Sequence, residues 1–193
     1  MPQLELVSPF SASAEAGRTA GDLSTIRCQV AGSSEELALH RRIRHEVFVV
    51  EQGLFIDSDH DEHDERTETV HALGMCGAIV AGTVRLYPLP ERGVWKGDRL
   101  AVLPRFRSHG LGGPLVRFAI RTAGQRGGER MIAFIQPQNV PVFEHLGWRR
   151  LGLPVDYVGQ PHQEMVIELS DPSERRDVSG ERHGRAPGPQ HPR

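Results

Sequence analysis

The sequence predicts one α/β (α+β) domain in which helices flank a mixed sheet. Segments with the short apolar pattern of strands alternate along the chain with segments of helical spacing. Two of the strands are separated only by a turn, which is typical of an antiparallel hairpin. A chain of 193 residues without a visible internal repeat has the length of one domain with tails.

The elements of this domain are expected within residues 25–170. In chain order we expect a strand at 25–31, a helix capped by Ser33 or Ser34 that runs through Val47, strands at 70–75 and 78–86 that turn near Gly77, a short strand at 99–103, a helix along 111–122, a strand at 131–135, a short helix at 140–146 and a strand at 164–169. Residues 1–24 are expected to be a flexible lead-in. Residues 171–193 lack large apolar side chains and are expected to be disordered.

Composition excludes several classes of protein. A formal net charge of −2 gives no indication of a nucleic-acid or membrane partner. Cys28 and Cys76 are too few for a disulfide framework or a cysteine-rich zinc site, so we expect reduced thiols and a cytoplasmic protein. The first residues lack the pattern of a signal peptide, and no apolar run exceeds about ten residues, which is too short to span a bilayer.

Residues 57–68 form an acidic segment that offers His60, His63 and three aspartates as metal ligands. A solvated loop is the favoured interpretation, and no metal is expected in the site. A further alternative is that the negative charge attracts a cationic amine or faces a partner subunit.

The run from Arg107 to Gly113 predicts a phosphate site between a strand and a helix. Its glycines permit positive φ, so that several backbone N–H groups can face one anion. The helix that begins near Leu111 adds its free amides and the positive end of its dipole. The run matches neither the Walker pattern nor the dinucleotide fingerprint. A purely structural strand-to-helix turn remains the alternative.

Several motifs in order resemble the GNAT (GCN5-related N-acetyltransferase) superfamily. Residues 99–112 are similar to its motif A and residues 136–148 to its motif B. The segments 44–53, Arg-His-Glu-Val-Phe-Val-Val-Glu-Gln-Gly, and 82–86, Gly-Thr-Val-Arg-Leu, resemble a subset with an Arg-x-x-Val-Phe-Val-x-Glu-Gln start. More loosely, the chain resembles actinobacterial and cyanobacterial members associated with nitrogen starvation. The resemblance covers about residues 25–170.

This resemblance implies a mostly antiparallel sheet that splays between its fourth and fifth strands, with acyl-CoA as cosubstrate. The strand at 101–103 would pair with the pantetheine arm, and the amides of 107–113 would hold the pyrophosphate. Gln136 would bond the pantetheine or satisfy the splayed backbone. The expected coenzyme-binding residues are Ala101, Val102, Leu103, Arg107, Ser108, His109, Gly110, Leu111, Gly112, Gly113, Gln136 and Phe143.

The acid and base of the reaction are less clearly marked. Phe143 stands where many members carry a Tyr that protonates the leaving thiolate, and a phenyl ring cannot donate a proton. Tyr157 and His162 are possible substitutes, although a packing Tyr and a surface His are the simpler interpretations. Glu51 and Asp98 are candidate general bases. The alternative interpretation is a helix-terminal carboxylate for Glu51 and a turn residue for Asp98.

We therefore expect a cytoplasmic N-acyltransferase that moves an acyl group, in the first instance acetyl, from coenzyme A to a small amine by direct attack. One alternative transfers a longer acyl chain, as acyl-homoserine-lactone synthases do. Another is a non-catalytic acyl-CoA-binding regulatory domain. A homodimer is expected from the family alone.

Overall fold

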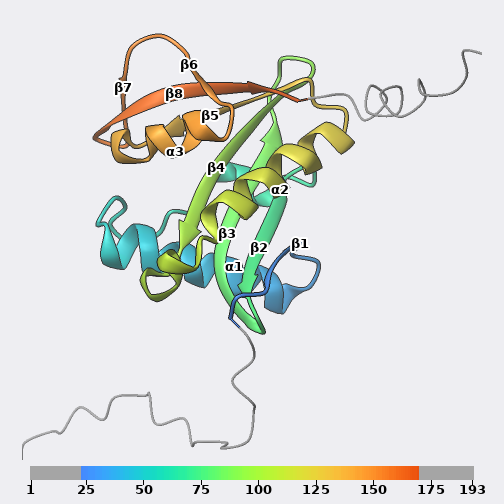
Figure 1. Ribbon diagram of the computed structural model, residues 1–193, viewed down its shortest axis with the longest axis vertical. Coiled ribbons are helices and arrows are strands. Elements are labelled where there is room, and N and C mark those ends of the chain that lie inside the picture. The colour runs from blue at the N-terminus through green and yellow to red at the C-terminus, as the bar shows by residue number, and fades with distance from the viewer. Residues whose placement is uncertain (1–22, 170–193) are drawn as a thin grey trace, which may run out of the picture.

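The computed structural model describes residues 23–169 as one α/β domain (Figure 1). The expected lead-in, apart from its last two residues, and the expected tail lie outside the described residues. The sheet has eight strands in the order β1-β2-β3-β4-β5-β8-β6, and β7 pairs with β8. Within residues 23–169, none of the helices has the length and apolar character needed to cross a membrane.

The strands confirm the expected order and correct its details. They are β1 (Ile26–Val30), β2 (Val70–Cys76), β3 (Ile79–Pro88), β4 (Val94–Val102), β5 (Arg130–Ile135), β6 (Arg149–Arg150), β7 (Val155–Tyr157) and β8 (Gln160–Glu168). Neighbouring strands are antiparallel except β4 and β5, which run parallel. The sequence did not predict β6, β7 or the first half of β4, because Lys96-Gly-Asp98 has the composition of a turn.

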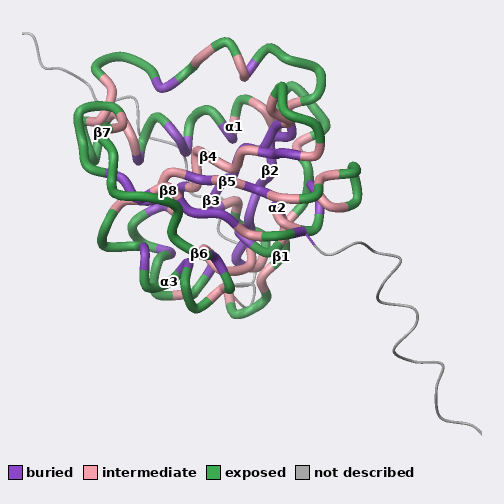
Figure 2. The backbone as a smooth tube through the Cα atoms, turned by 90° about the horizontal axis from the view of Figure 1, so that it is seen from above, coloured by how far each residue is buried: buried purple, intermediate pink, exposed green. Residues whose placement is uncertain are grey.

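The helices lie on both faces of the sheet, with α1 (Ser34–Arg44) and α2 (Gly112–Gln125) on opposite sides of the central strands (Figures 1 and 2). Ser33 and Glu36 form a capping box at the start of α1, which confirms the predicted cap. α1 continues into a π-helical segment, His45–Glu51. The third helix, α3 (Val140–His145), is short. Short 3₁₀ turns occupy Glu62–Glu65, Pro104–His109 and Pro137–Asn139.

Two glycines allow α2 to lie close against the sheet. A Cβ on Gly74 would approach the side chains of Leu111 and Leu115 to 3.0 Å, and one on Gly82 would lie 2.9 Å from the Ala101 carbonyl oxygen. Leu111 and Leu115 are fully buried. Because Gly74 belongs to β2 and Gly82 to β3, this close contact places the start of α2 against those two strands.

β4 and β5 part halfway along their length, as expected. Their parallel pairing covers only Val94–Lys96 of β4 and residues 130–132 of β5. β4 also carries a bulge, because Asp98 and Ala101 pair with Arg85 and Thr83 and leave two residues opposite one. Arg99, inside the bulge, has a φ of 51°. The fork between the two strands opens the centre of the domain.

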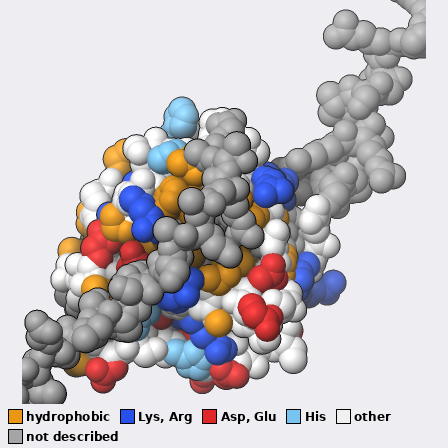
Figure 3. Space-filling view, turned by 90° about the horizontal axis from the view of Figure 1, so that it is seen from below, with side chains coloured by type: hydrophobic (Ala, Val, Ile, Leu, Met, Phe, Trp, Pro, Cys, Tyr) orange, Lys and Arg blue, Asp and Glu red, His pale blue; other side chains and the backbone are white. Residues whose placement is uncertain are grey.

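In the view from below, the visible side chains of the described residues are of mixed chemical kinds (Figure 3). Lysine and arginine side chains are interspersed there with acidic and apolar ones (Figure 3). This mixture agrees with the net charge of −2.

Candidate active site

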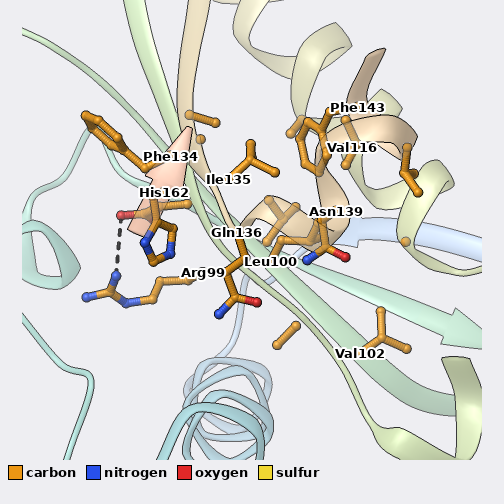
Figure 4. Close-up of a pocket in the computed structure, with 18 of the residues that line it drawn as sticks. Arg99, Leu100, Val102, Val116, Phe134, Ile135, Gln136, Asn139, Phe143 and His162 are labelled. Atoms are coloured by element: carbon orange, nitrogen blue, oxygen red, sulfur yellow. Dashed lines mark ion pairs between the residues drawn. The ribbon is translucent and has the colours of Figure 1, made fainter. Parts of the chain in front are cut away.

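A cavity of about 690 Å³ occupies the fork between β4 and β5. Residues of β4, β5, the start of α2, the π-helical segment and α3 line it. Figure 4 shows Phe134, His162 and Arg99 toward one end, and Phe143 and Val116 toward the other. A single hollow therefore joins the predicted phosphate cradle to a cluster of polar and aromatic side chains.

The phosphate cradle has the geometry that the sequence predicts. Gly110 adopts the left-handed conformation with a φ of 72°, and α2 begins two residues later. Within residues 23–169, the N–H groups of Leu111, Gly112 and Gly113 have no hydrogen-bond acceptor. A Cβ placed on Gly110 or Gly112 would meet nothing within 4 Å. The cradle thus presents unpaired amides at a helix N-terminus with open space in front of them, which suits an anion.

Glu51 lies at this cradle and is bound to Arg107. The Arg107 guanidinium donates to both Glu51 carboxylate oxygens, at 2.7 and 2.5 Å, and its Nε donates to the Val102 carbonyl oxygen at 3.1 Å. Hydrogen bonding from Arg107 lowers the pKa of Glu51. Glu51 does not line the cavity, so its position favours control of the Arg107 side chain over a role as general base.

The edge of β4 that faces the fork is free to pair with a ligand. β3 satisfies the other edge through Gly82 and Thr83, which pair with Val102 and Ala101. Pairing with β5 has already ended at Lys96. An extended, amide-containing chain can add to such an edge as an extra strand.

Beneath this edge lies an ion network that sequence reasoning missed. Three buried guanidinium groups meet four aspartates, and the network joins Arg44, Arg85 and Arg99 to Asp59, Asp61, Asp64 and Asp98. The interpretation of residues 57–68 as a solvated loop is therefore wrong for Asp59, Asp61 and Asp64, which form ion pairs with these buried arginines. Within residues 23–169, no cluster of metal-ligating side chains is present.

The network fixes Asp98 inside the cavity wall. Arg85 Nε and Nη2 donate to the two Asp98 oxygens at 2.8 and 2.7 Å, and Arg85 is fully buried. Burial alone would lower the pKa of Arg85, but its hydrogen bonds to Asp98 and Asp61 raise it overall, so the guanidinium stays charged. Asp98 therefore acts as the fixed partner of a permanent cation. The signal in the sequence was Arg85 itself, a charged residue in an apolar strand.

An aromatic cluster closes the end of the cavity away from the cradle. Phe134 stacks on Tyr157 with a centroid distance of 5.1 Å, and Tyr157 meets the edge of the His162 ring at 5.3 Å. The Lys96 ammonium lies 5.0 Å from the Phe134 centroid and 5.2 Å from that of Tyr157. Lys96 and Phe134 had no assigned role in the sequence.

Phe143 is an apolar wall of the cavity. Its ring is buried and meets Trp148 edge-on at 5.4 Å. Near it the cavity reaches Ala119 and Met131, which are also buried. Phe143, Ala119 and Met131 line the cavity and also belong to the hydrophobic core, so they give it an apolar portion of wall.

The structure brings most of the predicted coenzyme-binding residues to one cavity. The predicted residues that line it are Ala101, Val102, Arg107, Gly110, Gly112, Gly113, Gln136 and Phe143. Leu103, Ser108, His109 and Leu111 do not line it, and Leu111 packs in the core. Gln136 donates to Gln52 at 3.4 Å across the fork. Of the predicted catalytic residues, Asp98 and Tyr157 line the cavity.

The comparisons with known proteins agree with this geometry. A model of the acetyltransferase (GNAT) family matches residues 37–148, more than half of the chain. The chain belongs to the GNAT family. The Bacillus subtilis protein YjcF, named an uncharacterized N-acetyltransferase, is 28% identical over 143 residues, which are 73% of this chain and 99% of YjcF.

Solved structures share the fold of this GNAT protein. A Lactobacillus plantarum protein described as an N-acetyltransferase is 25% identical, with a TM-score of 0.67 over 75% of this chain and 99% of its own. The acyl-homoserine lactone synthase BjaI is 22% identical, with a TM-score of 0.62 over 79% of this chain and 86% of its own. The chain is thus an acyl-CoA N-acyltransferase of the GNAT type, and the predicted family is confirmed.

Proposed function

We propose that this GNAT enzyme transfers an acyl group from acyl-CoA directly to a small amine bound at the Lys96–Tyr157 end of the cavity. The observation that carries the proposal is the continuity of the hollow from the open cradle at Gly110–Gly113 to the aromatic cluster. In this arrangement the amides of the cradle bind the pyrophosphate, and the free edge of β4 pairs with the pantetheine arm. The thioester then reaches the bulge of β4.

The proposed chemistry needs few protein groups. The amine nitrogen attacks the thioester carbonyl carbon, a C–N bond forms, and the C–S bond breaks with its electron pair on sulfur. A bulge leaves the N–H of its extra residue unpaired, and we assign this group near Arg99 to the carbonyl oxygen, where negative charge develops. Holding both reactants in one cavity supplies much of the remaining acceleration.

Tyr157 is the proposed proton donor to the leaving thiolate, since Phe143 has no proton to give. Its ring is held between Phe134 and His162 in the cavity wall. Asp98 and Glu51 are proposed to position Arg85 and Arg107 instead of moving protons, because an arginine binds both oxygens of each carboxylate.

A panel of amines tests this function. Thiol release from acetyl-CoA should occur with at least one small amine and should depend on that amine. Isothermal titration with coenzyme A, done in parallel, should show that the coenzyme binds even when no amine is present. Tight binding without turnover on any amine or acyl-CoA would favour a non-catalytic acyl-CoA sensor, and no binding at all would contradict the coenzyme site.

A longer acyl chain is a second candidate, favoured by the apolar extension of the cavity to Ala119, Met131 and Trp148. BjaI, which shares the fold, is a CoA-dependent acyl-homoserine lactone synthase that was solved with isopentyl-CoA. If this extension receives acyl chains, kcat/KM should rise from acetyl-CoA to hexanoyl-CoA, and Ala119→Leu should reverse the preference. A steady fall from acetyl-CoA onward would exclude this candidate.

A further inference from the structure

We propose that His162 is the general base of the reaction and accepts the proton of the attacking amine at Nε2. The inference rests on the proposed acyl transfer and adds to it a catalytic residue at the acceptor end. His162 belongs to β8, far along the chain from the coenzyme cradle. It is 6% exposed overall, yet it lines the cavity.

The position of the ring protons follows from one hydrogen bond. His162 Nδ1 lies 2.9 Å from the Gln160 carbonyl oxygen. A carbonyl oxygen only accepts, so Nδ1 must carry the hydrogen and Nε2 must carry the lone pair in the neutral ring. The backbone thereby selects the tautomer whose free nitrogen is a base.

This free nitrogen faces the hollow. Within residues 23–169, Nε2 of His162 has no hydrogen-bond partner, and it is not among the fully enclosed unpartnered atoms. Figure 4 shows the ring projecting into the cavity near Arg99 and Gln136. Unlike the carboxylates of Glu51 and Asp98, Nε2 is therefore available to a substrate proton.

The His162 ring is packed among neighbouring side chains. Among the described residues, it is the only imidazole that lines the cavity. Tyr157 of β7 packs on its edge, and Lys96, Asp98 and Arg99 of β4 are the charged side chains that share this end of the hollow. The π-helical segment and the turn after it contribute Phe48, Gln52, Leu54 and Phe55 to the lining, none of which titrates. Asp98 and Arg99 are committed to the ion network.

The proton balance of the step is complete. As the C–N bond forms, the amine proton moves to His162 Nε2, and the electron pair of the broken C–S bond leaves with sulfur. The thiolate takes a proton from Tyr157, and the neighbouring His162 imidazolium then returns one to the phenolate. Over the cycle one amine proton is transferred to the coenzyme thiol.

The variant His162→Asn tests the role, because the Asn amide nitrogen can still donate to the Gln160 carbonyl oxygen. With acetyl-CoA and the best amine of the panel, kcat should fall by about 100- to 10,000-fold, while coenzyme A affinity is unchanged. The fall of kcat toward low pH that the wild-type enzyme shows should be absent in His162→Asn. His145→Asn, an exposed histidine on α3 that does not line the cavity, should match wild type. A His162→Asn variant with kcat within threefold of wild type, or with the same fall of kcat toward low pH, would overturn the proposal.

A second measurement is independent of the acceptor. Nitrogen-15 NMR of the protein at about pH 8 should show His162 as the Nδ1–H tautomer with an unprotonated Nε2. A predominant Nε2–H tautomer would overturn the proposal even if no amine is turned over. Failure of every amine combined with the expected tautomer would instead count against acyl transfer itself.

Discussion

Replacing Asp64 by Asn removes one charge from the centre of the buried ion network and changes almost no volume. The Asp64 side chain is fully buried. It accepts hydrogen bonds from Arg44 at 2.5 and 3.0 Å and from the Asp61 amide at 3.1 Å, and it forms an ion pair with Arg85 at 2.8 Å. An Asn at this position would place an NH₂ group against a guanidinium and leave two buried cations short of an anion.

Breaking one partner of a buried ion pair costs about 3–5 kcal/mol, which sets the expected loss at pH 7. For a domain of this size that loss corresponds to a fall in Tm of about 6–20 °C. Urea unfolding of both proteins measures the difference directly. Asp57→Asn, an exposed aspartate in the same segment, is the matched control and should change stability by less than about 0.5 kcal/mol.

The pH dependence of this loss has a definite sign. Burial alone would raise the pKa of Asp64, but hydrogen bonds and charge from Arg44 lower it well below its usual range. A carboxylate with a lowered folded-state pKa stabilises the fold above its unfolded-state pKa of about 3.9, and this contribution is lost as the pH falls. At pH 3 the deficit of the Asn variant should therefore be about 1 kcal/mol smaller than at pH 7.

Burial lowers the pKa of the neighbouring His40 to about 3. Protonation of His40 in acid therefore destabilises both the wild type and Asp64→Asn, and it does not remove the difference in stability between them. A deficit below about 1 kcal/mol at pH 7, or one that does not change with pH, would refute a network held by charge.

Three further predictions concern the coenzyme site and the helix that supports it. Glu51→Gln should release Arg107 and raise coenzyme A affinity at low salt by no more than about fivefold, because the ion pair is half exposed and therefore weak. A drop in kcat of about 100-fold or more would show instead that Glu51 is the general base. Gly82→Ala should lower the free energy of unfolding in urea by about 1–3 kcal/mol, because its Cβ would press on the Ala101 carbonyl oxygen and Leu115. An unchanged unfolding midpoint would show instead that β4 can shift to make room for the Cβ. Ser33→Ala should lower stability by about 1 kcal/mol through loss of the α1 cap, without altering coenzyme affinity, and a change in that affinity would contradict a purely local effect.

The turn and helix that we propose to bind the coenzyme were predictable as local structure, because their signals are local. A glycine-rich turn, the apolar spacing of α2 and the break after β5 lie within about forty residues, and each follows from backbone geometry. Gly110 adopts the positive φ that such a turn requires. The proposed coenzyme-binding function of this cradle came from the family resemblance.

The end of the cavity that we propose for the acceptor was less predictable, because its contacts join distant segments. Arg99 and Asp61 are 38 residues apart, and Arg85 and Asp61 are 24 apart. The composition of residues 57–68 suggests a solvated loop, and only the fold brings Asp59, Asp61 and Asp64 to buried cations. His162 likewise has the sequence surroundings of a surface residue, but in the fold it pairs with Val155 of β7 and lines the cavity.

Coenzyme A binding to Gly112→Trp tests the central claim most directly. Gly112 does not adopt a positive φ and has open space at its Cβ, so the indole should be tolerated by the fold and occupy the mouth of the cradle. Gln125→Trp, at the exposed far end of the same helix, is the control. Isothermal titration should show that Gly112→Trp weakens coenzyme A binding by about 100-fold or more, equivalent to about 2.7 kcal/mol. Gln125→Trp should bind coenzyme A with wild-type affinity, and the unfolding midpoint of Gly112→Trp should equal that of wild type. Wild-type affinity in folded Gly112→Trp would contradict a coenzyme site at this cradle.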